Sequence, residues 1–194
     1  MRYSTDHKQQ TRERIMRAAA GQFRAHGYDG VGVDGLVKAA GVTNGAFYGH
    51  FASKSAAYRE IVASGLTDLV EGIKRCRAEH GAAWPAVFAR FYFSEAKLDL
   101  VDNLCALPGF APDAVRVDAA VAQSFERELG EVHRHLAAGL AEQDADDRGW
   151  AMLAVMLGGV TLARAISDPA ARRQVAAVFE AQLVAAAGAG KPSI

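Results

Sequence analysis

The stretch Gly41–Lys54, GVTNGAFYGHFASK, gathers aromatic, small and polar residues into a short segment near the N-terminus. It follows VDGLVKAA at 33–40, where apolar residues recur at three- and four-residue steps, as in an amphipathic helix. Gly41 should end that helix, and Thr43 can cap the next one, which carries Phe47 and Phe51 one turn apart. Two short helices joined by a tight glycine-containing turn have the layout of a helix-turn-helix, whose second helix enters the DNA major groove.

The second helix has the residue types that contact with a duplex requires. Its two phenylalanines supply an inward stripe, which leaves its other sides for DNA. Small residues permit close approach, and polar side chains and the helix N-terminus can donate to phosphate oxygens. Asn44 can also bond adenine N6 and N7, although a phosphate or solvent role fits it equally well. The predicted DNA-binding residues are Thr43, Asn44, Gly45, Ala46, Tyr48, Gly49, His50 and Lys54. The alternative is an ordinary helical hairpin with core aromatics and a surface histidine.

The charge distribution favours the DNA interpretation. The chain of 194 residues has a formal net charge of zero, but residues 1–54 hold eight Lys and Arg against four Asp and Glu, a balance of +4. The remainder carries −4. A chain average hides this asymmetry, and a basic end suits a double-stranded DNA partner.

The rest of the chain predicts helices almost throughout, because no stretch alternates like a half-buried strand. We expect a first helix through Ile15 and Phe23, capped within residues 4–6 and ended near Gly27. Ser53 should cap a fourth helix that runs to about residue 79. The later helices are expected near 82–98, 102–109, 112–142, 145–167 and 170–187, separated at Pro108-Gly109, Pro112, the acidic segment 144–147 and Pro169.

The sequence gives no sign of a membrane protein or of an enzyme. No apolar run approaches the roughly 18 residues that span a bilayer, and the polar N-terminus is unlike a secretory signal, so we expect a cytoplasmic protein with no membrane partner. Cys76 and Cys105 are too far apart for a metal-binding spacing or a disulfide framework. The chain carries no phosphate-binding glycine loop and no nucleophile motif, so we expect no catalytic residue and no cofactor.

One alternative is a metal-dependent helical-bundle enzyme. Glu128, Glu131 and His135 share a helical face with the spacing of metal ligands in a bundle. Arg127 and Arg134 are interleaved with them, however, and a mixed-charge face is usually solvated.

The segment HGYDGVGVDGLVKAAGVTNGAFYGHFASKSAAY, residues 26–58, resembles the N-terminal domain of TetR-type transcriptional repressors. A glycine-aromatic pair, a helix ending in Ala-Ala-Gly-Val, a Gly-x-x-Tyr-x-His-Phe run and a Ser-Lys pair occur in order. The chain departs from the family pattern at Val31 and Gly32, where Ser or Thr often contacts a phosphate, and at Gly49, which is often bulky. Asn44 stands where a basic residue is common.

The resemblance implies an all-α protein with two domains. A three-helix helix-turn-helix domain would occupy residues 1–54, and a helical-bundle domain for effector binding and dimerisation would occupy 55–190. It further implies a homodimer that represses transcription from a palindromic operator and a small-molecule effector.

Aromatic residues of the larger domain are candidates to line an effector pocket, although such residues are more often plain core. Because few charges fall among them, a mainly apolar effector is expected. The candidates are Trp84, Phe88, Phe91, Tyr92, Cys105, Phe110, Phe125 and Trp150. Cys105 could instead make the regulator redox-sensing, but no basic residue stands near it to favour the thiolate.

The helix near 147–166 is apolar all round, which leaves it no solvent face and predicts a dimer contact, with a monomeric central helix as the alternative. The pair Gly158-Gly159 would permit close approach of a partner helix. The predicted interface comprises Met152, Val155, Met156, Gly159, Ala163, Val175, Val178, Phe179, Gln182 and Leu183.

Overall fold

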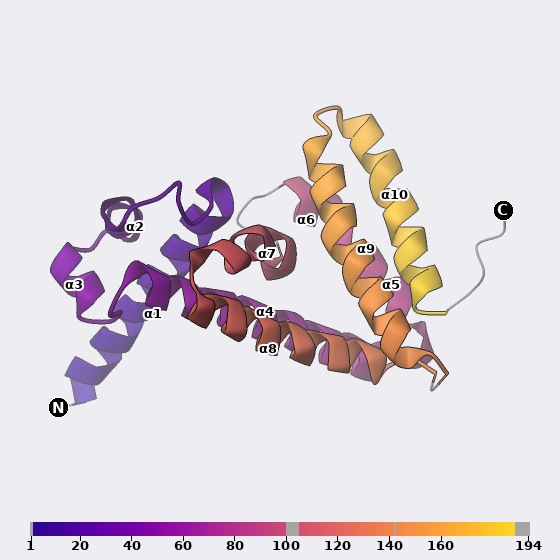
Figure 1. Cartoon of the computed structure of the whole chain (residues 1–194), viewed down its shortest axis with the longest axis horizontal. Helices are drawn as coiled ribbons and strands as arrows, with labels where there is room; N and C mark the ends of the chain where they lie inside the picture. The colour runs from indigo at the N-terminus through magenta and orange to yellow at the C-terminus, as the bar shows by residue number, and fades with distance from the viewer. Residues whose placement is uncertain (1, 100–104, 142, 189–194) are drawn as a thin grey trace. The chain divides into compact units, whose positions relative to one another are not determined.

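A computed structural model describes residues 2–99, 105–141 and 143–188, and throughout these ranges the regular elements are helices (Figure 1). The all-α prediction is therefore confirmed. The chain forms two compact units, and each unit is built from two separate segments of the sequence. Residues 1–64 and 109–125 make the first unit, and residues 65–108 and 126–194 make the second. The compact N-terminal unit thus takes in more of the chain than the expected DNA-binding segment 1–54.

The first unit contains α1 (Arg2–His26), α2 (Val33–Ala40), α3 (Asn44–Tyr48) and the start of α4 (Lys54–His80). The expected cap within residues 4–6 is wrong, because α1 already begins at Arg2. Gly27 and Gly41 end α1 and α2 with φ of +72° and +61°, a left-handed conformation that costs glycine little. The apolar stripes meet in a core of fully buried side chains, namely Ile15, Ala19, Phe23, Leu36, Phe47 and Tyr58.

Two later helices complete the first unit. They are α7 (Ala106–Val117), from Gly109 onward, and the N-terminal part of α8 (Ala119–Ala137). The predicted breaks at Pro108-Gly109 and at Pro112 are wrong, because both lie inside α7. Pro112 removes one backbone donor there. The break falls at Asp118, whose carboxylate accepts the Val121 N–H at 2.8 Å and so caps α8.

The second unit contains the end of α4, the 3₁₀ turn η1 (Gly81–Ala83), α5 (Trp84–Tyr92) and α6 (Glu95–Asp99). The expected helix 82–98 is interrupted at Phe93 and Ser94, where the Ser94 hydroxyl donates to the Phe91 carbonyl at 2.8 Å. Part of the helix expected at 102–109 lies outside the described residues.

The last two helices, α9 (Ala145–Ala165) and α10 (Pro169–Ala186), run side by side in opposite directions (Figure 1). The α10 helix packs against both α9 and α5. A Cβ atom at Gly159 would lie 2.8 Å from the rings of Phe93 and Phe179, so the glycine lets these helices close on one another. None of the described helices is both long enough and apolar enough to span a bilayer.

Candidate nucleic-acid interface

The helix α3 has the cap and the inward stripe that the sequence predicts. The Thr43 hydroxyl accepts the Ala46 N–H at 3.2 Å, which confirms Thr43 as the N-cap. Phe47 is fully buried, and its ring centroid lies 5.4 Å from that of Phe51. The opposite side is open: Tyr48 is 56% exposed. The predicted DNA-binding residues on this side are exposed at Thr43, Asn44, Gly45, Tyr48 and Gly49, and partly exposed at Ala46 and His50.

The side chain of Asn44 already has a hydrogen-bond partner within the helix-turn-helix. Its side-chain amide donates to the Asp34 carboxylate at 2.9 Å, and so joins the first residue of α3 to the first turn of α2. Because both side chains are exposed, water and DNA can compete for this bond.

Lys54 has a structural role that sequence reasoning missed. Its ammonium donates to the backbone carbonyls of Tyr28 at 2.9 Å and Val31 at 3.2 Å. It also lies 3.8 Å from the centroid of the Tyr28 ring. The side chain therefore holds the turn between α1 and α2, and contact with a phosphate would require it to give up these bonds. No sequence pattern relates Lys54 to a carbonyl 26 positions earlier.

Basic residues of α1 lie near His50, which is in the loop between α3 and α4. Burial first, and then the charges of Lys8 and Arg12, lower the pKa of His50. Arg12 also pairs with Glu60, and its guanidinium lies 5.2 Å from the Phe51 ring centroid. His50 therefore stands beside positive charges that suit a polyanion.

The predicted effector-binding residues are distributed over both units. Trp84, Phe88 and Tyr92 form a buried row on α5, with ring centroids 6.1 and 5.6 Å apart along it. Phe91 lies off this row, 58% exposed, and the Lys97 ammonium is 5.0 Å from its ring. Burial and the nearby half-buried Cys105 raise the pKa of Tyr92.

The other aromatics are placed differently. Phe110 and Phe125 belong to the first unit, where both are buried. Trp150 is 46% exposed and stacks on His133 with centroids 4.3 Å apart. The sequence could not place these rings, since an apolar aromatic has no marker that separates core from pocket.

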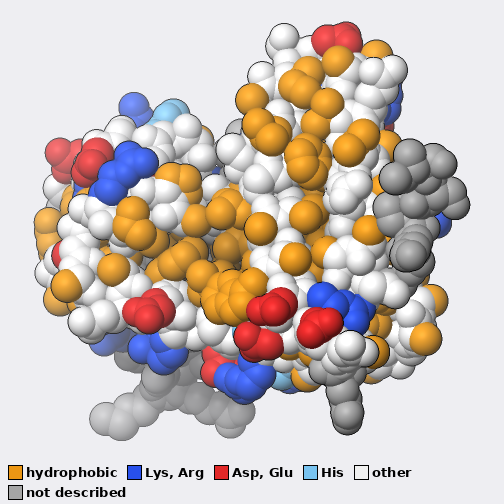
Figure 2. Space-filling model, turned by 45° about the vertical axis from the view of Figure 1, so that its right-hand side comes forward, with side chains coloured by type: hydrophobic (Ala, Val, Ile, Leu, Met, Phe, Trp, Pro, Cys, Tyr) orange, Lys and Arg blue, Asp and Glu red, His pale blue; other side chains and the backbone are white. Residues whose placement is uncertain are grey.

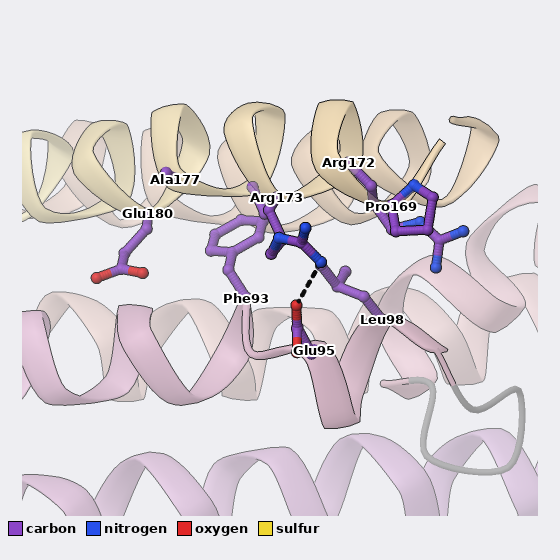
Figure 3. Close-up of a pocket in the computed structure, with 9 residues that line it drawn as sticks. Phe93, Glu95, Leu98, Pro169, Arg172, Arg173, Ala177 and Glu180 are labelled. Atoms are coloured by element: carbon purple, nitrogen blue, oxygen red, sulfur yellow. Dashed lines mark hydrogen bonds and ion pairs between the residues drawn. The ribbon is translucent and has the colours of Figure 1, made fainter. Parts of the chain in front are cut away.

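A cleft of about 220 Å³ in the second unit was not predicted. The ion pair between Arg173 of α10 and Glu95 of α6 crosses it at 3.1 Å (Figure 3). Its lining residues are Phe93, Glu95, Leu98, Pro169, Arg172, Arg173, Ala176, Ala177 and Glu180.

The residues of the predicted dimer interface differ in their exposure within the single chain. Met152, Met156, Ala163 and Leu183 have no exposed surface, and Gly159 is closed by rings of its own chain. Val155, Val175 and Phe179 are half-buried, whereas Val178 and Gln182 are exposed. When a helix is apolar on all sides, its hydrophobic periodicity does not indicate which side faces outward.

The outer face of α9 and α10 is nevertheless apolar or small in most positions. Hydrophobic side chains are scattered along the column that holds these helices (Figure 2). Leu162 is 55% exposed and Val178 is 58% exposed. The exposed residues that define this outer face are Ala151, Ala154, Thr161, Leu162, Ala165, Ala177, Val178, Ala181 and Gln182.

The charged face proposed as an alternative metal site is occupied by ion pairs. Glu128 pairs with Arg127 at 2.9 Å, and Glu131 pairs with Arg134. Within the described ranges, no group of three His, Cys, Asp or Glu side chains is placed to hold a metal ion.

The fold and part of the sequence match known regulators. Residues 15–61 match the family model of bacterial regulatory proteins of the tetR family. The structure resembles a TetR-family transcriptional regulator from Agrobacterium tumefaciens, with a TM-score of 0.77 and 16% identity over 90% of this chain and 98% of that one. It also resembles reduced NemR from E. coli, with a TM-score of 0.76 and 14% identity over 90% and 95% of the two chains. No curated protein sequence matches the chain. The matched segment holds the helix-turn-helix described above; residues 15–61 are thus similar to the tetR family of bacterial regulatory proteins, and the chain has the fold of TetR-family transcriptional regulators.

Proposed function

We propose that the protein is a repressor that binds a palindromic operator as a homodimer and releases it when a small, mainly apolar effector binds. The observation that carries DNA recognition is α3 itself. Its N-terminus is capped by Thr43, Phe47 anchors it, and its outer side, including Tyr48, is open. In such a geometry the N-terminal residues of the helix meet base edges and the flanking groups meet phosphates.

Selection of duplexes from a random-sequence pool by the purified full-length protein tests this proposal. Two recognition helices related by a dimer axis should recover an inverted repeat whose half-sites lie about one helical turn apart or somewhat farther. Affinity for the recovered duplex should fall steeply with salt, because each phosphate contact releases counterions. Recovery of no common sequence, or binding insensitive to salt, would refute the assignment.

The dimer is proposed to form through the outer face of α9 and α10. Seven of the nine residues that define this face are Ala, Val or Leu, and exposed Arg173 lies one turn before Ala177 at its edge. At Gly158 an added Cβ would meet no atom within 4 Å. A helix pair of this kind can pack against its symmetry mate as a four-helix contact.

The effector is proposed to bind within residues 80–160, beside the buried aromatic row of α5. Release requires that the effector favour a dimer in which the two helix-turn-helix units are wrongly spaced, because equal affinity for both states shifts nothing. The α4 helix is the proposed lever, since it starts directly after the helix-turn-helix and continues into the second unit. The fluorescence of Trp84 and Trp150 against a compound collection, read together with operator release, would test the coupling. Compounds that bind tightly without changing operator affinity would contradict it.

A further inference from the structure

A carboxylate from α7 binds the turn between α1 and α2. The Gly27 N–H closes the end of α1 on the Phe23 carbonyl at 2.9 Å. The next N–H, that of Tyr28, lies beyond the helix and donates to Asp113 Oδ2 at 2.8 Å. Asp113 is 85 residues away in the chain but belongs to the same compact unit. A carboxylate that accepts a backbone N–H is one of the stronger hydrogen bonds in proteins.

Tyr28 is held at its other groups as well. Its carbonyl accepts from Lys54, whose ammonium also lies over its ring. The ring packs on Phe23 and Tyr58, with centroids 6.0 and 5.1 Å away. The backbone of residue 28 is therefore fixed from α4 on one side and from α7 on the other.

Other contacts hold the segment around Asp113 against the N-terminal helices. The Tyr58 hydroxyl donates to the Phe110 carbonyl at 3.3 Å, and the Arg24 guanidinium lies 5.3 Å from the Phe110 ring centroid. The Ser55 hydroxyl donates to Asp118, which also caps α8. Asp113 thus sits on a supported segment and not on a loose one.

We propose that Asp113 is a positioning residue for operator binding. By fixing the Tyr28 amide it sets the turn from which α2 begins, and the packing of α2 on α3, to which the bond between Asn44 and Asp34 adds, passes that orientation to α3. The role rests on DNA binding alone, and it requires neither an effector nor a dimer. A part of the chain that lies far from the helix-turn-helix in sequence then governs how well the protein binds DNA.

Three variants of the full-length protein test this role. Asp113→Ala removes the acceptor, Asp113→Asn keeps an acceptor oxygen without the charge, and Arg116→Ala is the matched control, because Arg116 is exposed on the same helix. The probe is a duplex selected by the wild-type protein, titrated well below the unfolding temperature. Loss of a charge-assisted bond predicts about a tenfold or larger fall in affinity for Asp113→Ala. Asp113→Asn should have most of the wild-type affinity. Arg116→Ala should bind within about twofold of the wild type, because substitution of an exposed residue outside such a contact has little effect.

Two further readouts separate positioning from a lost DNA contact. Affinity should decline with salt at the wild-type slope in every variant, because no phosphate contact is removed. Hydrogen exchange at the Tyr28 amide should accelerate in Asp113→Ala and stay slow in Asp113→Asn. If the wild type selects no duplex, the proposed function fails, but amide exchange still tests the bond.

Wild-type affinity in a folded Asp113→Ala, or an Asn variant as weak as the Ala variant, overturns the proposal. If Asp113→Ala does not fold, Asp113→Glu takes its place. Its extra methylene moves the carboxylate while keeping the charge, and an affinity equal to that of the wild type overturns the proposal in the same way.

Discussion

The side-chain amide of Asn44 donates to the carboxylate of Asp34 at 2.9 Å, so the residue best suited to bind adenine is already bonded within the helix-turn-helix. Asp34→Ala should free this amide. We predict that duplexes selected by Asp34→Ala show a stronger preference for adenine at one position of each half-site than those selected by the wild type. The Asn44→Ala variant should show no such preference. Identical selected sequences for all three proteins would exclude a base contact by Asn44.

Ala46 offers an independent test of the same helix. It is partly exposed one turn before His50, and Ala46→Val adds bulk without charge. We predict that this variant changes which duplexes are selected while the salt dependence of binding stays as in the wild type, because base edges and not phosphates are affected. A uniform loss over all sequences would instead mean that the substitution only disturbs α3.

Lys54 is predicted to act through the turn that it holds. Lys54→Ala should lower the free energy of unfolding by about 1–3 kcal/mol, because two carbonyls lose a charged donor. Its affinity for the selected duplex should fall with an unchanged salt slope. If Lys54 contacts a phosphate in the complex, the slope should decrease by about one. Lys38→Ala, an exposed lysine of α2, is the control, and titrations at four salt concentrations decide between the two roles.

Sequence reasoning succeeded where chemistry is local. Thr43, Gly41 and Phe47 act over one helical turn, so cap, stop and buried stripe followed from spacing alone. It could not find contacts between residues far apart in the chain. The bonds from Lys54 to the Tyr28 and Val31 carbonyls were missed because these residues become neighbours only in the folded chain.

The interface helices show the same limit. Met152 and Met156 are as apolar as Leu162, and only the packing of α9 against α10 and α6 shows which of them faces outward. Likewise, nothing around Pro112 indicated that α7 runs through it to the cap at Asp118.

One leucine variant and one glycine variant separate the dimer contact from the core of the second unit. Leu162→Glu places a charge on the exposed outer face, so it should yield a folded monomer in sedimentation, with a wild-type circular dichroism spectrum. Gly159→Val adds atoms against Phe93 and Phe179 and should cost about 1–3 kcal/mol of stability through overpacking. A Leu162→Glu protein that remains a dimer would place the interface elsewhere.

His50 gives the unfolding free energy a dependence on pH. Burial and the charges of Lys8 and Arg12 lower its pKa below the usual 6.5. As the pH falls, the unfolded chain therefore binds a proton at His50 before the folded protein does. The contribution of neutral His50 to the free energy of unfolding is complete above the usual pKa of 6.5 and is lost as the pH falls through the lower pKa of the folded state. Denaturant titrations from pH 7.5 to 5 should show the wild type losing stability relative to His50→Gln. A relative gain on acidification would contradict the assignment.

The most direct test of the central claim, that α3 enters the operator, is site-specific photo-crosslinking. Benzoylphenylalanine is placed at Tyr48, on the open side of α3, and in a second protein at Val115, which is 76% exposed on α7. Irradiation with the labelled selected duplex should give an adduct from position 48 that excess unlabelled duplex abolishes, and little or none from position 115. No adduct at position 48, or equal yields from both positions, would contradict DNA recognition by α3.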